Sequence, residues 1–100
     1  MIKHVIMLKL KDFAQGKSKA ENAAIIKRDL ESLRATIKEI RHLEVGINVT
    51  QEPDAYDVAL YSEFADKKAL ETYLKHPDHV KVGEFVRSVR ESRIVVDYEF

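Results

Sequence analysis

The stretch IKHVIMLKL, residues 2–10, decides the fold. Its even positions are apolar with one exception, His4, whereas its odd positions mix two lysines with Val5 and Met7. Because successive side chains of a strand point to opposite faces, this alternation predicts a strand with one buried face and one mixed face. His4 is therefore expected among the buried side chains.

A long helix is predicted after this strand. Ser18 and Glu21 have the spacing of a capping box, in which the serine hydroxyl and the glutamate carboxylate each bind a free N–H at the helix start. Apolar residues then recur in steps of four and three, as one buried helix face requires. They are Ile26, Leu30, Leu33, Ile37 and Ile40. The charged side chains expected to face solvent are Lys27, Arg28, Glu31 and Lys38.

A period of two returns beyond Arg41 and predicts two further strands, over 43–49 and 56–64. Residues 51–55 between them are rich in turn formers, and the connection is short enough to indicate a hairpin. The last strand is predicted over 93–100.

Two helical segments are predicted between the third and the fourth strand. Asp66 is placed to cap the first segment. Pro77 separates the two, because proline disfavours a helical conformation in the residue before it but fits the first turn of a new helix. His76 is therefore expected at the junction. The apolar face of the second segment consists of Val82, Phe85, Val86 and Val89.

This order of elements predicts one α+β domain over 1–100. A strand, a helix, two strands, two helical segments and a strand form a ferredoxin-like two-layer sandwich with a four-stranded antiparallel sheet. The mixed sheet face is too apolar to be left to water, so a homodimer that packs sheet on sheet is expected. The residues expected at that interface are Val5, Met7, Ala59, Tyr61 and Val95.

Composition argues against several classes of partner. Lysine and arginine (17) balance aspartate and glutamate (17), so no net field attracts nucleic acid or an anionic membrane. The chain has no cysteine, as is common in the reducing cytosol, and its N-terminal apolar run is too short for a signal peptide or a membrane span. A cytoplasmic protein is expected.

Three residues are the best candidates for chemistry. His4 on the buried strand face and His79 on the sheet-facing side of the last helix could meet, with Tyr73 beside them. A partly buried neutral imidazole can act as a base, and a tyrosine hydroxyl can donate to charge that develops on a substrate oxygen. The further residues expected to line a substrate pocket are Leu60, Ser62, Phe85 and His76.

Each candidate also has a plainer interpretation. His4 could be a core histidine with a satisfied hydrogen bond, Tyr73 a core aromatic, and His76 a helix cap. A zinc site of His76, His79 and His4 is the competing chemical interpretation, but proline separates the first two and no further ligand is placed. Ser62 lacks a nucleophile elbow, which argues against a serine hydrolase. The three glycines form no phosphate-binding loop. No cofactor or metal is expected.

Three segments carry a resemblance to a known family. IKHVIMLKLKD, TYLKHPDHVKVGEFV and ESRIVVDYEF resemble the stress-responsive A/B barrel domain, a member of the dimeric α+β barrel superfamily. The resemblance spans almost the whole chain and implies that two ferredoxin-like protomers join their sheets in a barrel.

The resemblance also bears on activity. The chain looks like the plant polyketide cyclase that forms olivetolic acid by aldol condensation without metal or organic cofactor. In that resemblance His79 is the base that removes a proton α to a carbonyl, while Tyr73 and His4 hold the substrate oxygens. Val58 stands where the cyclase has another pocket histidine, so the same substrate is not implied.

Three hypotheses follow. The first is a homodimeric, stress-associated protein with a small-molecule pocket near His4, Tyr73 and His79, which takes a hydrophobic or polyketone-like ligand. The second is a cofactor-free lyase or cyclase with His79 as general base. The third is a purely structural stress protein with filled cores.

Overall fold

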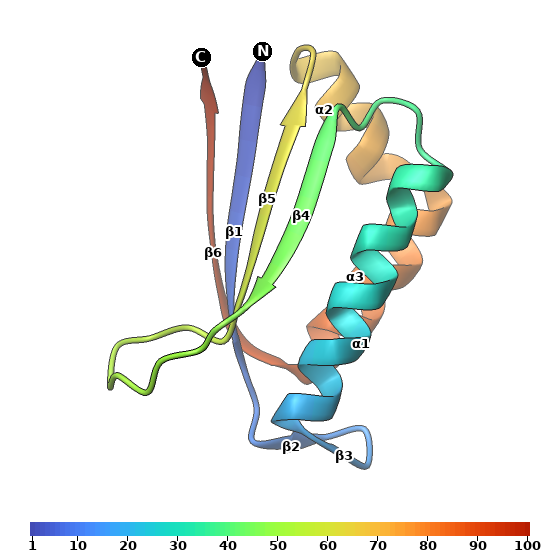
Figure 1. Cartoon of the computed structure of the whole chain (residues 1–100). Helices are drawn as coiled ribbons and strands as arrows, with labels where there is room; N and C mark the ends of the chain where they lie inside the picture. The colour runs from blue at the N-terminus through green and yellow to red at the C-terminus, as the bar shows by residue number, and fades with distance from the viewer.

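The computed structural model describes residues 1 to 100 and consists of two layers, a sheet and the helices on one of its faces (Figure 1). Four antiparallel strands form the sheet in the order β4-β5-β1-β6. They are β1 (Ile2–Leu10), β4 (His42–Ile47), β5 (Val58–Phe64) and β6 (Arg90–Glu99). The covering helices are α1 (Lys19–Ser32), α2 (Lys67–Lys75) and α3 (Pro77–Val89). This is the predicted ferredoxin-like α+β arrangement.

A small hairpin that the sequence pattern did not reveal precedes α1. It pairs β2 (Phe13–Ala14) with β3 (Lys17–Ser18). Gln15 and Gly16 at its tip have φ of 53° and 72°, as the two central residues of a tight hairpin turn require. The hairpin brings Ser18 to the start of α1.

Helix α1 begins as predicted but ends earlier. The Ser18 hydroxyl accepts the Glu21 N–H at 3.2 Å, and the Glu21 carboxylate accepts the Ser18 N–H at 3.0 Å. After Ser32 the chain tightens into a 3-10 turn, η1 (Leu33–Ala35), and the N–H of Ile37 bonds the Leu33 carbonyl. Ile37 is still buried, so the apolar stripe continues in irregular chain.

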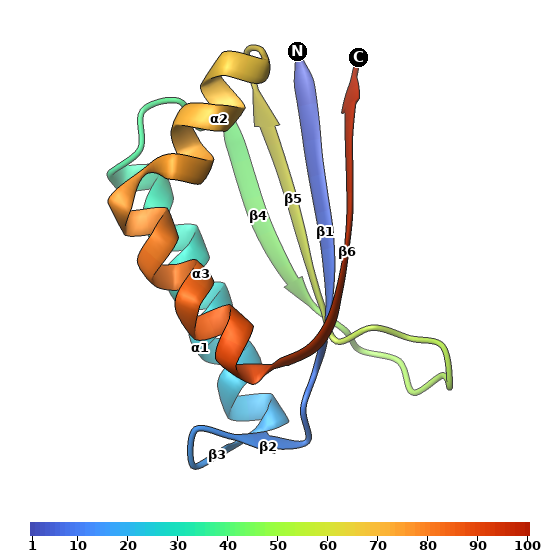
Figure 2. The same cartoon turned by 180° about the vertical axis from the view of Figure 1, so that it is seen from behind.

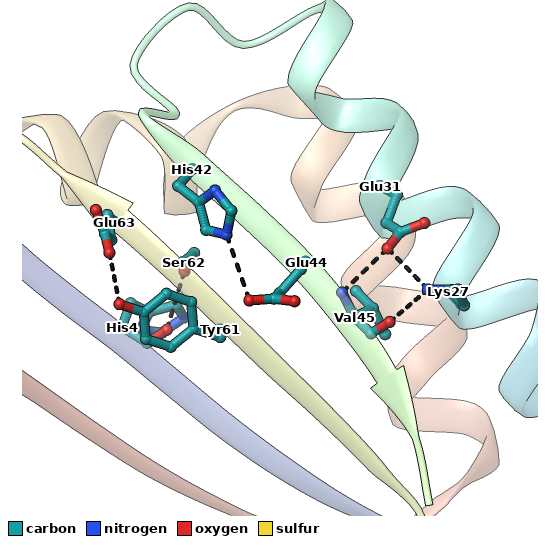
Figure 3. A network of polar contacts seen from close by, with 9 residues as sticks. All are labelled: His4, Lys27, Glu31, His42, Glu44, Val45, Tyr61, Ser62 and Glu63. Carbon is teal, nitrogen blue, oxygen red and sulfur yellow. Dashed lines mark hydrogen bonds and ion pairs between the residues drawn. The ribbon is translucent and has the colours of Figure 1, made fainter.

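Two α1 residues that were expected in water instead bind the edge strand β4 (Figure 3). The Glu31 carboxylate accepts the Val45 N–H at 3.1 Å, and Lys27 donates both to Glu31 and to the Val45 carbonyl. The hydrogen bond from Lys27 holds the pKa of Glu31 below its usual value. The pair therefore satisfies backbone groups that an edge strand would otherwise leave open.

The junction of α2 and α3 confirms the prediction from Pro77. Asp66 caps α2 by accepting the Ala69 N–H at 2.8 Å, and α2 ends at Lys75. His76 is the N-cap of α3, and its Nδ1 accepts the Asp78 N–H at 3.1 Å. The plainer interpretation of His76 as a helix cap is thus confirmed.

Two strand predictions need correction. The strand predicted over 43–49 ends at Ile47, and Val49 is 94% exposed in the loop that reaches away from the helices (Figures 1 and 2). The last strand begins at Arg90, and its pairing places Val95 opposite Ile6, on the helix-covered face. Val95 is therefore not on the outer face where it was expected.

The sheet face away from the helices is bare (Figure 2). The buried apolar side chains form one cluster between the sheet and the helices. On the opposite face, β6 aligns Ile94 with Met7 and Val96 with Val5. Val96 is 60% exposed, and Met7 and Ile94 are exposed too, so the central part of this face is an apolar strip in water.

Candidate functional site

His4 is buried in the centre of the sheet. Its ring Nδ1 bonds the carboxylate of Asp97, the residue directly opposite on β6. The Ser62 hydroxyl donates to the backbone carbonyl of His4 at 3.0 Å (Figure 3). Since an ionised carboxylate can only accept, Nδ1 carries the proton. Nε2 of His4 has no partner in the protein.

Tyr73 lies between the two candidate histidines. Its ring centroid is 4.4 Å from that of His79 and 6.3 Å from that of His4. The side chain is fully buried, and its hydroxyl has no hydrogen-bond partner. Burial raises the pKa of the Tyr73 hydroxyl well above its usual value, so the group stays a neutral donor. A buried hydroxyl without a hydrogen-bond partner lowers the stability of the folded protein, so it calls for an explanation.

His79 has a defined tautomer. Its Nδ1 lies 3.1 Å from the backbone carbonyl of Leu74, which can only accept, so the proton is on Nδ1. In the neutral ring, Nε2 is then a free acceptor. Burial lowers the pKa of His79 below its usual value, and the nearby charge of Arg93 lowers it further, against the effect of the Leu74 carbonyl. His79 is therefore a neutral base near pH 7.

His79 lines a pocket of about 300 Å³ between the sheet and the helices. The sheet contributes Ile6, Leu8 and Leu60, while Leu74, Gly83 and Val86 close the helical side. Apart from its two chain neighbours and the backbone of its own helix, no heavy atom lies within 4 Å of the position that a Cβ on Gly83 would take, so this glycine leaves open space. The volume is at the small end of the range for ligand pockets.

Three arginines line the same pocket: Arg87 on α3, and Arg90 and Arg93 on β6. Arg93 pairs with Leu8 and therefore lies on the helix-covered side of the sheet. The lining includes no aspartate or glutamate. The pocket thus joins an apolar interior to a cationic rim.

The structure brings together some of the predicted site residues and separates others. His4, Tyr73 and His79 form one group of ring contacts, and Leu60 lines the pocket with His79. The other predicted residues lie outside the pocket lining, and among them His4 and Tyr73 are fully buried behind it. Ser62 is buried under its bond to His4, His76 caps α3, and Phe85 packs half-buried against the core.

Sequence reasoning missed Asp97 and the three arginines. Asp97 could have been found from the alternation of β6, but only with the right phase of that strand. Arg87 lies on α3, whereas Arg90 and Arg93 lie on β6. Their spacing of three therefore does not correspond to one face of a single element, and the sequence pattern did not group them. The change from helix to strand at Arg90 is what brings them to one pocket.

Other site classes find less support. No group of three histidine, aspartate or glutamate side chains is placed to hold a metal ion. None of the helices combines the length and the apolar composition needed to cross a bilayer.

Comparison with known sequences finds a matching family model and similar proteins. The family model described as stress responsive A/B barrel domain matches residues 2–100. An uncharacterised protein of Streptomyces coelicolor is 32% identical over 100 residues, which is the full length of both chains. Olivetolic acid cyclase of Cannabis sativa is 28% identical, over 97% of this chain and 94% of its own.

A solved structure agrees with the observed architecture. The crystal structure of a dimeric protein of unknown function with a ferredoxin-like fold, from Bacteroides fragilis, has a TM-score of 0.81 to this chain. The two sequences are 36% identical, and the match covers 99% of this chain and 95% of that one.

Proposed function

Because the chain belongs to the stress-responsive A/B barrel domain family, we propose that it is a homodimer that binds a small apolar molecule in each protomer, beside His79. The observation that carries this proposal is the open pocket of about 300 Å³ whose wall holds a neutral imidazole with a free acceptor nitrogen. A protein with a purely structural role would gain stability by filling such a space.

The homodimer is supported by the bare sheet face. A strip of Val5, Met7, Ile94 and Val96 lies in water in the single chain, and burying it against a second copy removes that apolar area from solvent. The related Bacteroides fragilis protein is described as dimeric. The interface would close the two sheets on each other and leave both pockets on the helical side.

The test uses Gly83, because this residue lines the pocket one helical turn after His79 and a leucine there takes up pocket space. Octanol is the probe, and the signal is the shift of the His79 ring resonances in NMR. We expect Gly83→Leu to abolish the response and Glu84→Leu, an exposed neighbour on the same helix, to leave it unchanged. An equal response of both variants, or no response of the natural protein, contradicts the proposal.

A second candidate function is a cofactor-free aldol cyclisation or lyase reaction. The supporting observation is the group of His79, Tyr73 and His4, together with the similarity to olivetolic acid cyclase. His79 Nε2 would take a proton from the carbon between two carbonyls. The enolate would then attack a distant carbonyl of the same molecule, forming a C–C bond, and the new alkoxide would regain a proton from the imidazolium.

Tyr73 fits this second function as a donor. A hydroxyl kept neutral by burial can donate to the enolate oxygen as charge develops. The Tyr73 hydroxyl has no partner in the protein and lies behind the pocket lining, so this role requires that the substrate reach past the lining residues to it. Hydrogen exchange at the acidic carbon of a 1,3-diketone, followed by NMR in D₂O, tests the first step. Loss of exchange in His79→Gln supports catalysis, whereas exchange no faster than in buffer excludes it.

A further inference from the structure

The rim of the pocket has a property that the proposed binding of an apolar molecule does not explain. Arg87, Arg90 and Arg93 surround a space that is otherwise lined by aliphatic side chains and His79. The chain as a whole carries no net charge, so three cations without a single carboxylate in one lining are a local concentration of charge. Such a rim attracts anions.

None of the three arginines has a partner within the chain. Neither an ion pair nor a side-chain hydrogen bond engages Arg87, Arg90 or Arg93, whereas Arg28 on α1 pairs with Asp29. Arg90 is half-buried, and a guanidinium that leaves water without a counterion loses solvation that only an anion or a polar ligand restores. Their planar donors suit the two oxygens of a carboxylate or a phosphate.

A structural explanation accounts for part of this cluster. Cations near the end of a helix interact well with its partial negative charge, and Arg87 and Arg90 lie in the last turn and at the C-cap of α3. The interaction with the helix end does not account for Arg93. That residue lies on β6 opposite Leu8, on the face that the pocket occupies, and three residues past the helix cap.

We propose that the ligand is an amphiphilic anion: its apolar part lies against Ile6, Leu60 and Val86, and its carboxylate or phosphate head is held by Arg87, Arg90 and Arg93. This inference rests on the proposed pocket and specifies its ligand class. The small volume of about 300 Å³ suits a single chain or ring, and the head stays at the rim, where water still reaches Arg87 and Arg93.

The experiment compares three probes of equal tail length by calorimetry: octanoate, octyl phosphate and octanol. We expect at least one of the anions to bind about tenfold more tightly than octanol, as one charge-assisted contact would give. The anion that binds better identifies the head group. Added salt should weaken the binding of the anion and leave the affinity for octanol unchanged.

Variants separate the role of the arginines from general charge. Arg93→Gln should remove most of the preference for the anion, and Arg93→Lys should keep part of it. Lys81→Gln, which removes one exposed cation from α3 outside the pocket, should change nothing.

The outcomes also distinguish the two proposals. Equal affinity for octanol and both anions, with loss of all binding in Gly83→Leu, overturns the anionic ligand but keeps the apolar pocket. If no probe binds, the pocket proposal itself is wrong. Arg93→Gln could instead weaken the dimer in sedimentation and leave octanoate affinity unchanged. That result would assign the arginines to carboxylates of the second copy and overturn the inference.

Discussion

His4 and Asp97 lie directly opposite each other on the antiparallel strands β1 and β6, and the imidazole Nδ1 bonds the carboxylate. The two partners differ in exposure, since the His4 side chain is 2% exposed and that of Asp97 is 43% exposed. The carboxylate thus links a buried ring to the open edge of the sheet. Because an ionised carboxylate only accepts, it fixes the tautomer of His4 with the proton on Nδ1.

The first prediction removes this carboxylate. Asp97→Ala leaves a buried N–H without an acceptor, which should lower the free energy of unfolding by about 1 to 2 kcal/mol. Asp97→Asn keeps an acceptor oxygen and should recover part of the loss. Urea denaturation measures both, with Asp54→Ala in the exposed loop as control. Equal stability of all three variants would show that His4 needs no partner.

The second prediction concerns the protonation of His79. Because burial lowers its pKa, the folded protein binds this proton less well than the unfolded chain. Stability should therefore rise with pH between the folded pKa and the unfolded value near 6.5, and be lost as the pH falls through that window. NMR titration of the ring should give a midpoint below 6.5.

His79→Gln should flatten this part of the stability curve, because no group that changes its proton affinity on folding remains at that position. His42→Gln, at an exposed position at the start of β4, is the matched control and should keep the natural pH dependence. A His79 midpoint above the unfolded value would mean that a counterion outweighs burial.

The third prediction uses two glycines with opposite backbone requirements. Gly83 lies inside α3 beside open space, so Gly83→Ala should stabilise the protein by about 0.4 to 1 kcal/mol through the lower entropy of the unfolded chain. Gly16 has φ of 72° in the β2-β3 turn, and Gly16→Ala should cost about 1 kcal/mol. Thermal unfolding measures both. A destabilising Gly83→Ala would mean that the pocket wall is tighter than the structure indicates.

The sequence predicted the elements well where one face is clearly apolar. The alternation of β1, the capping box at Ser18 and the proline at position 77 each had a single physical interpretation, and each was confirmed. Three local patterns therefore placed most of the ferredoxin-like fold. The group of His4, Tyr73 and His79 followed from the faces of those elements.

The final strand shows where such reasoning stops. Ile94, Val95 and Val96 are apolar at three successive positions, so a period of two has no unique phase there. Pairing with β1 sets the phase, and the register shifts between Lys9 and Leu10, a feature that no sequence pattern marks. The positions of Asp97 and Arg93 depend on that phase, which is why both were missed.

The fourth prediction tests the outer sheet face. If two copies pack through it, sedimentation at micromolar concentration should give about twice the 11.5 kDa chain mass. Val96→Lys places a charge in the middle of the apolar strip and should give monomers, because an unpaired ammonium cannot be buried there without a large loss of solvation.

Val80→Lys is the matched control for that variant, since Val80 is also a partly exposed valine but lies on α3, across the molecule from the bare face. It should remain dimeric. If Val96→Lys remains dimeric, the interface lies elsewhere. If the natural protein is monomeric, no second copy covers the apolar strip and the homodimer is contradicted. Since the pockets lie on the helical side, monomeric Val96→Lys should still bind octanol, so that assembly and ligand binding are separable.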